Sequence, residues 1–266
     1  MRKGGLLWGL LLLMGGILFL LDNLGFLPIS ALSLFFPGVL ILIGLWFLLG
    51  PLMFRQVVET RTLSLPANGS TAAQIKFRHG AGKISIGSLS AGNNLLEGTF
   101  AGGVEEKIDG SGSETNIRLS VPEMEWWGFP SMASSNGFSW DVMLNKQIAY
   151  ALDIKTGASK TSLDLHDLII TDLNMDFGGN GTEVFLPEQA GKTTCHFNFG
   201  SATLELHVPS NVAARIKIDG AMLETSGIDE QRFPKTGGIF CSPDYSTAAN
   251  TIDITVEAGV GKVIVH

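Results

Sequence analysis

The sequence predicts a membrane-anchored all-β protein, in which a domain of stacked strands follows a two-helix transmembrane hairpin. Three observations predict this fold class: two apolar runs near the N-terminus, a change to short β-type runs after residue 54, and a recurring glycine-marked unit. Hydrophobic residues make up 45% of the 266 residues and charged ones only 16%, against about 25% charged residues in typical globular chains. This composition excludes a disordered chain.

The two apolar runs predict the hairpin of residues 1–54, with helices at about 5–21 and 34–54. No charged residue lies between Lys3 and Asp22, or between Asp22 and Arg55. A spanning helix needs about 20 apolar residues, which both runs approach or exceed. A cleaved signal peptide is the competing interpretation, but the first run ends without the small residues of a cleavage site.

The flanking charges predict the orientation of the hairpin. Arg2 and Lys3 precede the first helix, Arg55 and Arg61 follow the second, and the connecting loop has no Lys or Arg. The positive-inside rule then places the N-terminus and the β domain on the cytoplasmic side. We therefore expect a multi-pass protein of the cell (inner) membrane, with the lipid bilayer as its first partner.

One face of the first helix carries small residues. Gly5, Gly9 and Gly16 are four and seven residues apart, which places them on the same side of a helix. Small residues let a second helix approach closely. We expect this face to pack against the second helix of the same chain; the alternative is a contact with a partner protein.

A short unit recurs in residues 55–266, consisting of an apolar residue, glycine with small neighbours, and an alternating strand. Gly157, Gly178 and Gly200 are 21 and 22 residues apart, and Gly102 again follows Gly80 by 22. Such a period predicts a β-solenoid-like stack in which each unit covers its neighbour. The last copy runs to Val265, and because no polar cap follows it, end-to-end assembly between chains stays open.

Both parts of the chain carry motifs of known families. The N-terminal motifs are Gly4-Gly5-Leu6-Leu7, Leu20-Leu21-Asp22-Asn23-Leu24-Gly25 and the run from Phe36 to Leu45. The C-terminal motifs are the run from Trp140 to Asn145, Leu152-Asp153-Ile154, Gly157-Ala158-Ser159, Leu163-Asp164-Leu165 and Leu186-Pro187. The first set resembles the transmembrane region of LiaI/LiaF-like proteins, and the second resembles the toast-rack (LiaF C-terminal, adhesin-like) β domain.

The resemblance implies a toast-rack fold and a function without catalysis. We expect a bacterial membrane-anchored regulator or scaffold of the LiaF type, which acts in the cell-envelope stress response through protein–protein contacts and restrains a membrane sensor protein. The alternatives are an outward-facing adhesin-like or lipid-contacting module, a self-assembling structural solenoid forming homo-oligomers, and an enzyme or sugar-binding solenoid.

The residues themselves reveal no catalytic, cofactor or metal site. The net charge of −7 argues against nucleic acid as a partner. The five histidines (His79, His166, His196, His207 and His266) lack the spacing of metal ligands. Three Gly-Lys pairs, at 82–83, 191–192 and 261–262, lack the upstream glycine and the following helix of a phosphate-binding loop. We therefore expect no enzyme and no cofactor.

An aromatic segment forms an insertion near 122–139. Trp126, Trp127 and Phe129 lie there among Gly, Pro and Ser residues, where they could form a partner contact or a membrane-interface anchor. Alternatively, they fold back over an exposed end of the stack. Trp140 opens a strand and is expected in the core.

Overall fold

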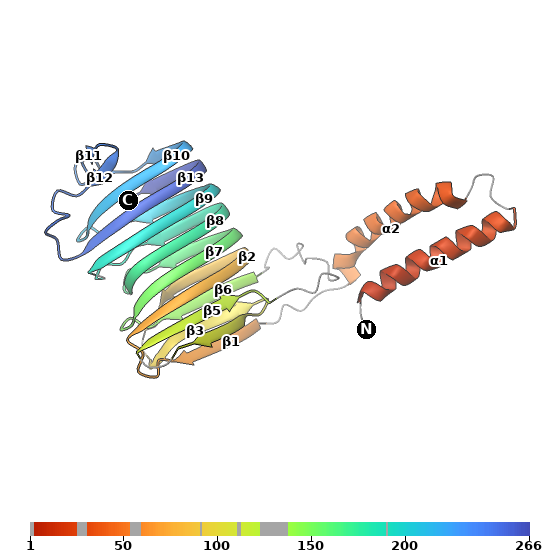
Figure 1. The fold of residues 1–266 in the computed structure, drawn as a ribbon, viewed down its shortest axis with the longest axis horizontal. Helices are drawn as coiled ribbons and strands as arrows, with labels where there is room; N and C mark the ends of the chain where they lie inside the picture. The colour runs from red at the N-terminus through yellow and green to blue at the C-terminus, as the bar shows by residue number, and fades with distance from the viewer. Residues whose placement is uncertain are drawn as a thin grey trace. The chain divides into compact units, whose positions relative to one another are not determined.

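The computed structural model describes residues 3–25, 31–53, 60–90, 92–110, 113–122, 138–189 and 191–266. The chain divides into two compact units. One contains the helices α1 (Lys3–Asn23) and α2 (Ala31–Met53), and the other contains all the strands (Figure 1). Each unit is described by itself below.

The two helices meet through small residues. A Cβ added at Gly15 would lie 3.3 Å from a ring carbon of Phe35, and one added at Gly38 would lie 3.1 Å from Sδ of Met14. Close approach at these two positions depends on the missing side chains. Within the described residues, neither helix combines the length and the apolarity needed to cross a membrane.

The helix contact differs from the predicted one. A Cβ at Gly9 or Gly16 would meet no described atom within 4 Å. The contact therefore uses Gly15, which lies about 100° around the helix from Gly16. The surroundings of Gly5 lie outside the described side chains.

In the described part of the chain, the β unit is one mixed sheet of 13 strands, which confirms the predicted all-β class. The strands are β1 (Thr60–Pro66), β2 (Ala72–Ser88), β3 (Asn94–Ala101), β4 (Glu105–Asp109), β5 (Glu114–Ser120), β6 (Phe138–Leu144), β7 (Ala149–Asp164), β8 (Ile169–Phe185), β9 (Lys192–His207), β10 (Ala213–Ser226), β11 (Lys235–Thr236), β12 (Ile239–Cys241) and β13 (Thr251–Val265). Their order is β1-β3-β6-β2-β7-β8-β9-β13-β10-β12-β11, and β5 joins β4 to β2.

Each long strand bends once near its middle. In β7, alternate residues from Tyr150 to Thr156 are buried, the next two, Gly157 and Ala158, are exposed, and burial then alternates again from Ser159. The two exposed residues reverse which side faces the core, because successive side chains of a strand point to opposite faces. Every long strand thus has a first limb and a second limb, which form the two layers of the stack (Figure 1).

The limbs stack at the predicted period. Ile154 of β7 lies opposite Met175 of β8, which lies opposite Phe197 of β9, in parallel register. These offsets of 21 and 22 residues confirm the repeat read from the glycines. The interval ending at Gly102 is not part of it, because β3 runs antiparallel to its neighbours β1 and β6 and Gly102 follows its end.

The last copy of the repeat does not end the stack. β13 pairs in parallel with β9 on one side and with β10 on the other. The chain therefore passes from β10 through β11 and β12 and then returns. Its last strand, β13, lies between β9 and β10, which both precede it in the sequence. β10 lies beyond Val265, which corrects the expectation of an uncapped end there.

A single apolar core fills the space between the limbs. Trp140 of β6 is fully buried, as predicted, and its ring lies edge-on to those of His79 and Phe100. In β9, Cys195 is buried and its neighbour His196 lies on the opposite, outer face. The same alternation places other polar side chains of the long strands on the outside of the stack.

Candidate functional site

A shallow groove of about 570 Å³ runs along the bend of the stack. Gly157, Gly178 and Gly200 lie side by side along it, each on a successive strand. A Cβ at Gly157 would lie 2.6 Å from the carbonyl oxygen of Gly80, closer than packed atoms approach. The floor of the groove is therefore closely stacked backbone, flanked by polar side chains of the first limbs. We call this row of Gly157, Gly178 and Gly200 the glycine ridge.

Ion pairs connect the outer faces of neighbouring first limbs beside this ridge. The guanidinium of Arg78 donates to both carboxylate oxygens of Asp153, at 3.1 and 2.8 Å. Lys155 Nζ lies 2.7 Å from a carboxylate oxygen of Asp176. The hydrogen bonds from Arg78 hold the pKa of Asp153 below its usual value. These pairs fix the charged side chains in place across β2, β7 and β8.

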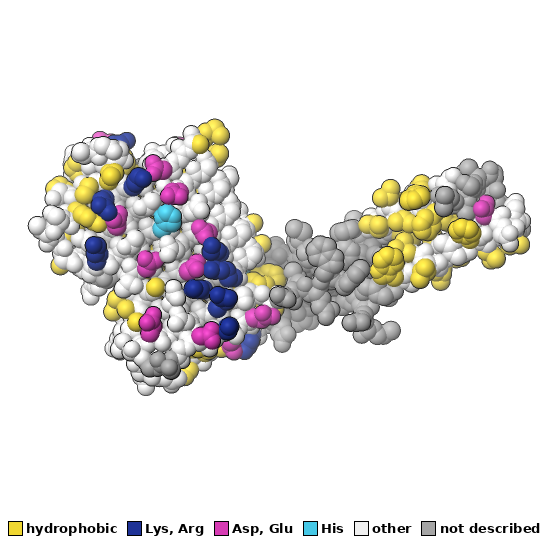
Figure 2. All heavy atoms as spheres, viewed as in Figure 1, with side chains coloured by type: hydrophobic (Ala, Val, Ile, Leu, Met, Phe, Trp, Pro, Cys, Tyr) yellow, Lys and Arg dark blue, Asp and Glu magenta, His cyan; other side chains and the backbone are white. Residues whose placement is uncertain are grey.

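Cations without such partners adjoin these pairs. Lys107, Arg118 and Lys76 are register neighbours on β4, β5 and β2, and like charges on adjacent strands repel. Within the described residues, the side chains of Lys76 and Arg118 make no hydrogen bond or ion pair, although Asp153 is the register neighbour of Lys76 on β7. Lys107 has one exposed contact with Asp109. We call Lys76, Arg78, Lys107, Arg118 and Lys155 the basic group; Figure 2 shows Lys and Arg side chains gathered in this way, with Asp and Glu around them.

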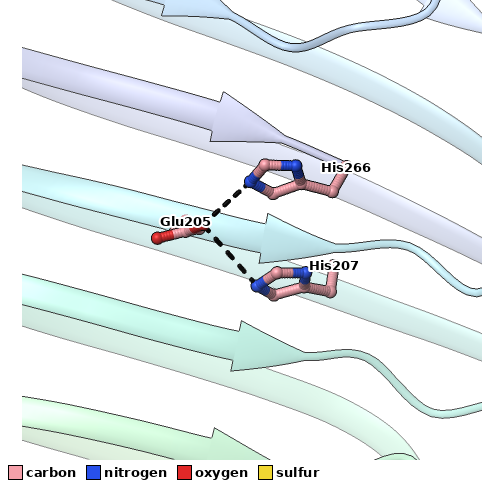
Figure 3. Close-up of side chains that lie close together, drawn as sticks. All are labelled: Glu205, His207 and His266. Atoms are coloured by element: carbon pink, nitrogen blue, oxygen red, sulfur yellow. Dashed lines mark hydrogen bonds and ion pairs between the residues drawn. The ribbon is translucent and has the colours of Figure 1, made fainter.

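A second polar group lies on the outer face of the second limbs. Glu205, His207 and His266 come together where β9 and β13 end (Figure 3). The two imidazole rings are stacked, with centroids 4.8 Å apart and planes within 12°. Sequence spacing could not reveal this group, because the two histidines are 59 positions apart and only the parallel pairing of β13 with β9 joins them.

The aromatic residues predicted as a contact surface, Trp126, Trp127 and Phe129, lie outside the described residues. The strands on either side of that segment are placed. β5 pairs with the first limb of β2 and β6 with its second limb. β5 therefore ends, and β6 begins, at the level where the other long strands bend.

The three Gly-Lys pairs do not resemble phosphate-binding loops in the structure. Gly82-Lys83 and Gly261-Lys262 lie inside β2 and β13, and Gly191-Lys192 lies at the start of β9. A phosphate-binding loop requires a following helix whose N-terminal amides receive the phosphate. Where the structure describes the chain after residue 59, all three pairs are followed by strand, as the sequence predicts.

Comparison with known proteins identifies the architecture. A family model described as the N-terminal domain of toast_rack, DUF2154, matches residues 54–207. The crystal structure of a candidate cell adhesion protein from Clostridium sporogenes, at 1.95 Å resolution, is similar with a TM-score of 0.68 and 20% sequence identity, over 78% of this chain and 98% of that one. At this identity the likeness concerns the fold alone. The search of curated proteins gave no match.

Proposed function

The chain belongs to the toast-rack family, and from this premise we propose that it is a non-enzymatic, membrane-anchored scaffold whose β unit holds an acidic protein partner. The observation that carries the proposal is the basic group. Lys76 and Arg118 stand side by side, and within the described residues neither side chain makes a hydrogen bond or an ion pair. Asp153 lies opposite Lys76 on β7 but is paired with Arg78, so a partner carboxylate would stabilise the two adjacent cations. The strands that carry them, β2 and β5, are each hydrogen-bonded to strands on both sides and supply a rigid base.

The anchor in this proposal is the helical unit. α1 and α2 expose large apolar side chains: Leu12 is 74% exposed, Leu40 71% and Ile41 67%. Contiguous exposed apolar surface marks a contact with lipid or protein. Neither described helix by itself has the length and apolarity of a span, so this step depends on the full uncharged runs of the sequence. We infer that these runs form the two spans of a hairpin in the cell membrane, with the N-terminus and the β unit on the cytoplasmic side.

The regulatory part of the proposal is supported by the LiaF-like motifs of both parts of the chain. A LiaF-type protein would restrain a membrane sensor in cell-envelope stress signalling. The helical unit would contact the sensor in the bilayer, where Gly9 and Gly16 are left open by α2. Trp126, Trp127 and Phe129 are further proposed contact residues, toward the partner or the membrane surface.

Charge reversal of the basic group tests the proposal. The full-length chain in nanodiscs is cross-linked to solubilised membrane proteins of its own host, and the captured proteins are identified by mass spectrometry. We expect capture of a membrane protein with an acidic cytoplasmic segment, at least tenfold weaker for the double variant Lys76→Glu/Arg118→Glu. Lys192→Glu is the matched control, because Lys192 is exposed on β9 outside the basic group.

The outcome of that comparison decides the proposal. Capture that falls in the double variant and with rising salt, but not in Lys192→Glu, supports an electrostatic docking face. Equal capture by all three proteins, or capture of no membrane protein, contradicts it.

A second candidate function is an outward-facing adhesin-like module. The likeness of fold to the candidate cell adhesion protein favours it. Cys241 is half-buried and Cys195 fully buried, so a membrane-impermeant maleimide reports the side on which Cys241 lies. The scaffold proposal predicts labelling only after cells are permeabilised, and labelling of intact cells would favour the adhesin-like function.

A further inference from the structure

The group formed by Glu205, His207 and His266 has the composition of a metal site. Nε2 of His266 lies 2.8 Å from a carboxylate oxygen of Glu205, and Nε2 of His207 lies 3.8 Å from the same oxygen. One ligand atom of each residue lies within 4.8 Å of the others. Ligands at zinc–ligand distances of about 2.0–2.2 Å stand roughly 3.3 Å apart in a tetrahedron, so small side-chain rotations would close the group around an ion.

The arrangement leaves one polar atom, Nε2 of His207, unsatisfied within the described residues. This nitrogen is shielded from solvent and makes no hydrogen bond to any of them. Glu183 and Glu205 are register neighbours on β8 and β9, and adjacent carboxylates repel each other. Oε1 of Glu183 lies 3.4 Å from His207 Nε2. A cation between these groups would accept the free lone pair of His207 and neutralise both carboxylates.

The surroundings orient the ligands and leave an approach. The ring of Phe185 stacks on His207, with centroids 4.1 Å apart and planes within 7°. This stacking contact restricts the orientation of the imidazole ring. A hollow of about 240 Å³ next to the group is lined by His166, Glu188 and both histidines, among others, and it has room for water or a further ligand.

We propose that Glu205, His207 and His266 bind a divalent transition-metal ion, with Glu183 within reach as a fourth ligand. Imidazole nitrogens and carboxylate oxygens together suit zinc. His207 ends β9 and His266 follows β13, so the ion would join two strands that lie far apart in the sequence. The site goes beyond the proposed scaffold function and would hold β13 in its place between β9 and β10.

Metal binding by the full-length chain tests this inference. The purified protein in detergent is stripped with a chelator and titrated with zinc chloride by calorimetry at pH 7.5. We expect one zinc per chain, a thermal unfolding midpoint raised by several degrees, and weaker binding at pH 5.5, because the ligands must lose their protons to bind. Cobalt(II) in place of zinc should give the visible absorption of a tetrahedral site.

Variants distinguish this site from binding elsewhere on the surface. His207→Gln and His266→Gln should each weaken zinc binding at least tenfold and abolish the thermal shift. His196→Gln is the matched control, since His196 lies on β9 but on the outer face of its first limb. An absence of stoichiometric binding, or equal binding by all variants, would overturn the proposal. Neither result depends on whether a protein partner is captured.

Discussion

His79 is a titratable side chain enclosed by the core at the bend of β2. It is 3% exposed, its Nδ1 lies 2.8 Å from the hydroxyl oxygen of Ser159, and its ring lies edge-on to Trp140. Burial penalises the charged imidazolium and lowers the pKa of His79 to about 4. The native state therefore holds this histidine neutral.

This pKa predicts an acid-sensitive stability. The unfolded chain titrates His79 near 6.5 and the folded chain near 4, so the unfolded state binds more protons between these values. The free energy of unfolding is therefore unaffected by His79 above pH 6.5 and decreases as the pH drops toward 4, because protonation of His79 favours the unfolded state. We expect wild type to lose about 2 kcal/mol more than His79→Gln between pH 7 and pH 4.5, measured by urea unfolding followed by tryptophan fluorescence. Parallel losses in both proteins would contradict the assignment.

At the scale of the element, the glycine ridge decides how closely the bent strands can stack. Gly157, Gly178 and Gly200 each face the carbonyl oxygen of the glycine on the preceding strand, but the space differs along the ridge. A Cβ would lie 2.6 Å from this oxygen at Gly157, 3.2 Å at Gly178 and 3.5 Å at Gly200, and would meet nothing within 4 Å at Gly80. The same substitution therefore probes four degrees of crowding.

A series of alanine substitutions should follow this order. Gly157→Ala forces backbone apart in two strands, and we expect it to lower the free energy of unfolding by about 1–3 kcal/mol. Gly178→Ala should cost less. Gly200→Ala should be close to neutral, and the control Gly80→Ala neutral or slightly stabilising, because alanine restricts the unfolded chain. Chemical denaturation measures the series, and equal effects at Gly157 and Gly80 would refute the crowding argument.

For the whole molecule, the insertion of β13 determines which end of the stack is open. β13 is hydrogen-bonded on both sides, whereas β10 pairs with β12 only over Arg215–Lys217. Met222, on the second limb of β10, is 68% exposed. The second limb of β10 is thus an unpaired edge, the kind of surface through which sheets add further strands. Self-association by strand addition needs a free edge, such as this limb of β10 or the edge strands β1 and β4. β13, which ends at Val265, offers no such edge because it is paired on both sides.

Hydrogen exchange read by mass spectrometry should show the same topology. We expect the amides of β13 to exchange as slowly as those of β9, and the amides after Ile218 in β10 to exchange faster, because they line the edge of the sheet. Rapid exchange in β13, at the level of the β10 edge, would mean that β13 does not lie inside the stack.

Much of the architecture could be predicted because it depends on local pattern. Side chains alternate across a strand, so the apolar residues of Leu163-Asp164-Leu165 indicate a half-buried strand before any partner is known. The interval between Gly157 and Gly178 equals the offset between neighbouring strands. Burial of Trp140 follows from the same alternation. These features repeat within about 22 residues, the length of one stacked unit.

Features that depend on distant pairing could not be predicted in this way. His207 and His266 meet because β13 returns to lie beside β9, and Lys76 and Arg118 meet because β5 pairs with β2. A repeated unit is compatible with several neighbours, so periodicity alone does not choose among them. The choice is made by long-range packing and hydrogen bonding in the folded sheet. The amino-acid sequence therefore determines the repeating strands. The order of the strands in space is decided only by the tertiary structure, and with it the basic group and the group of Glu205, His207 and His266.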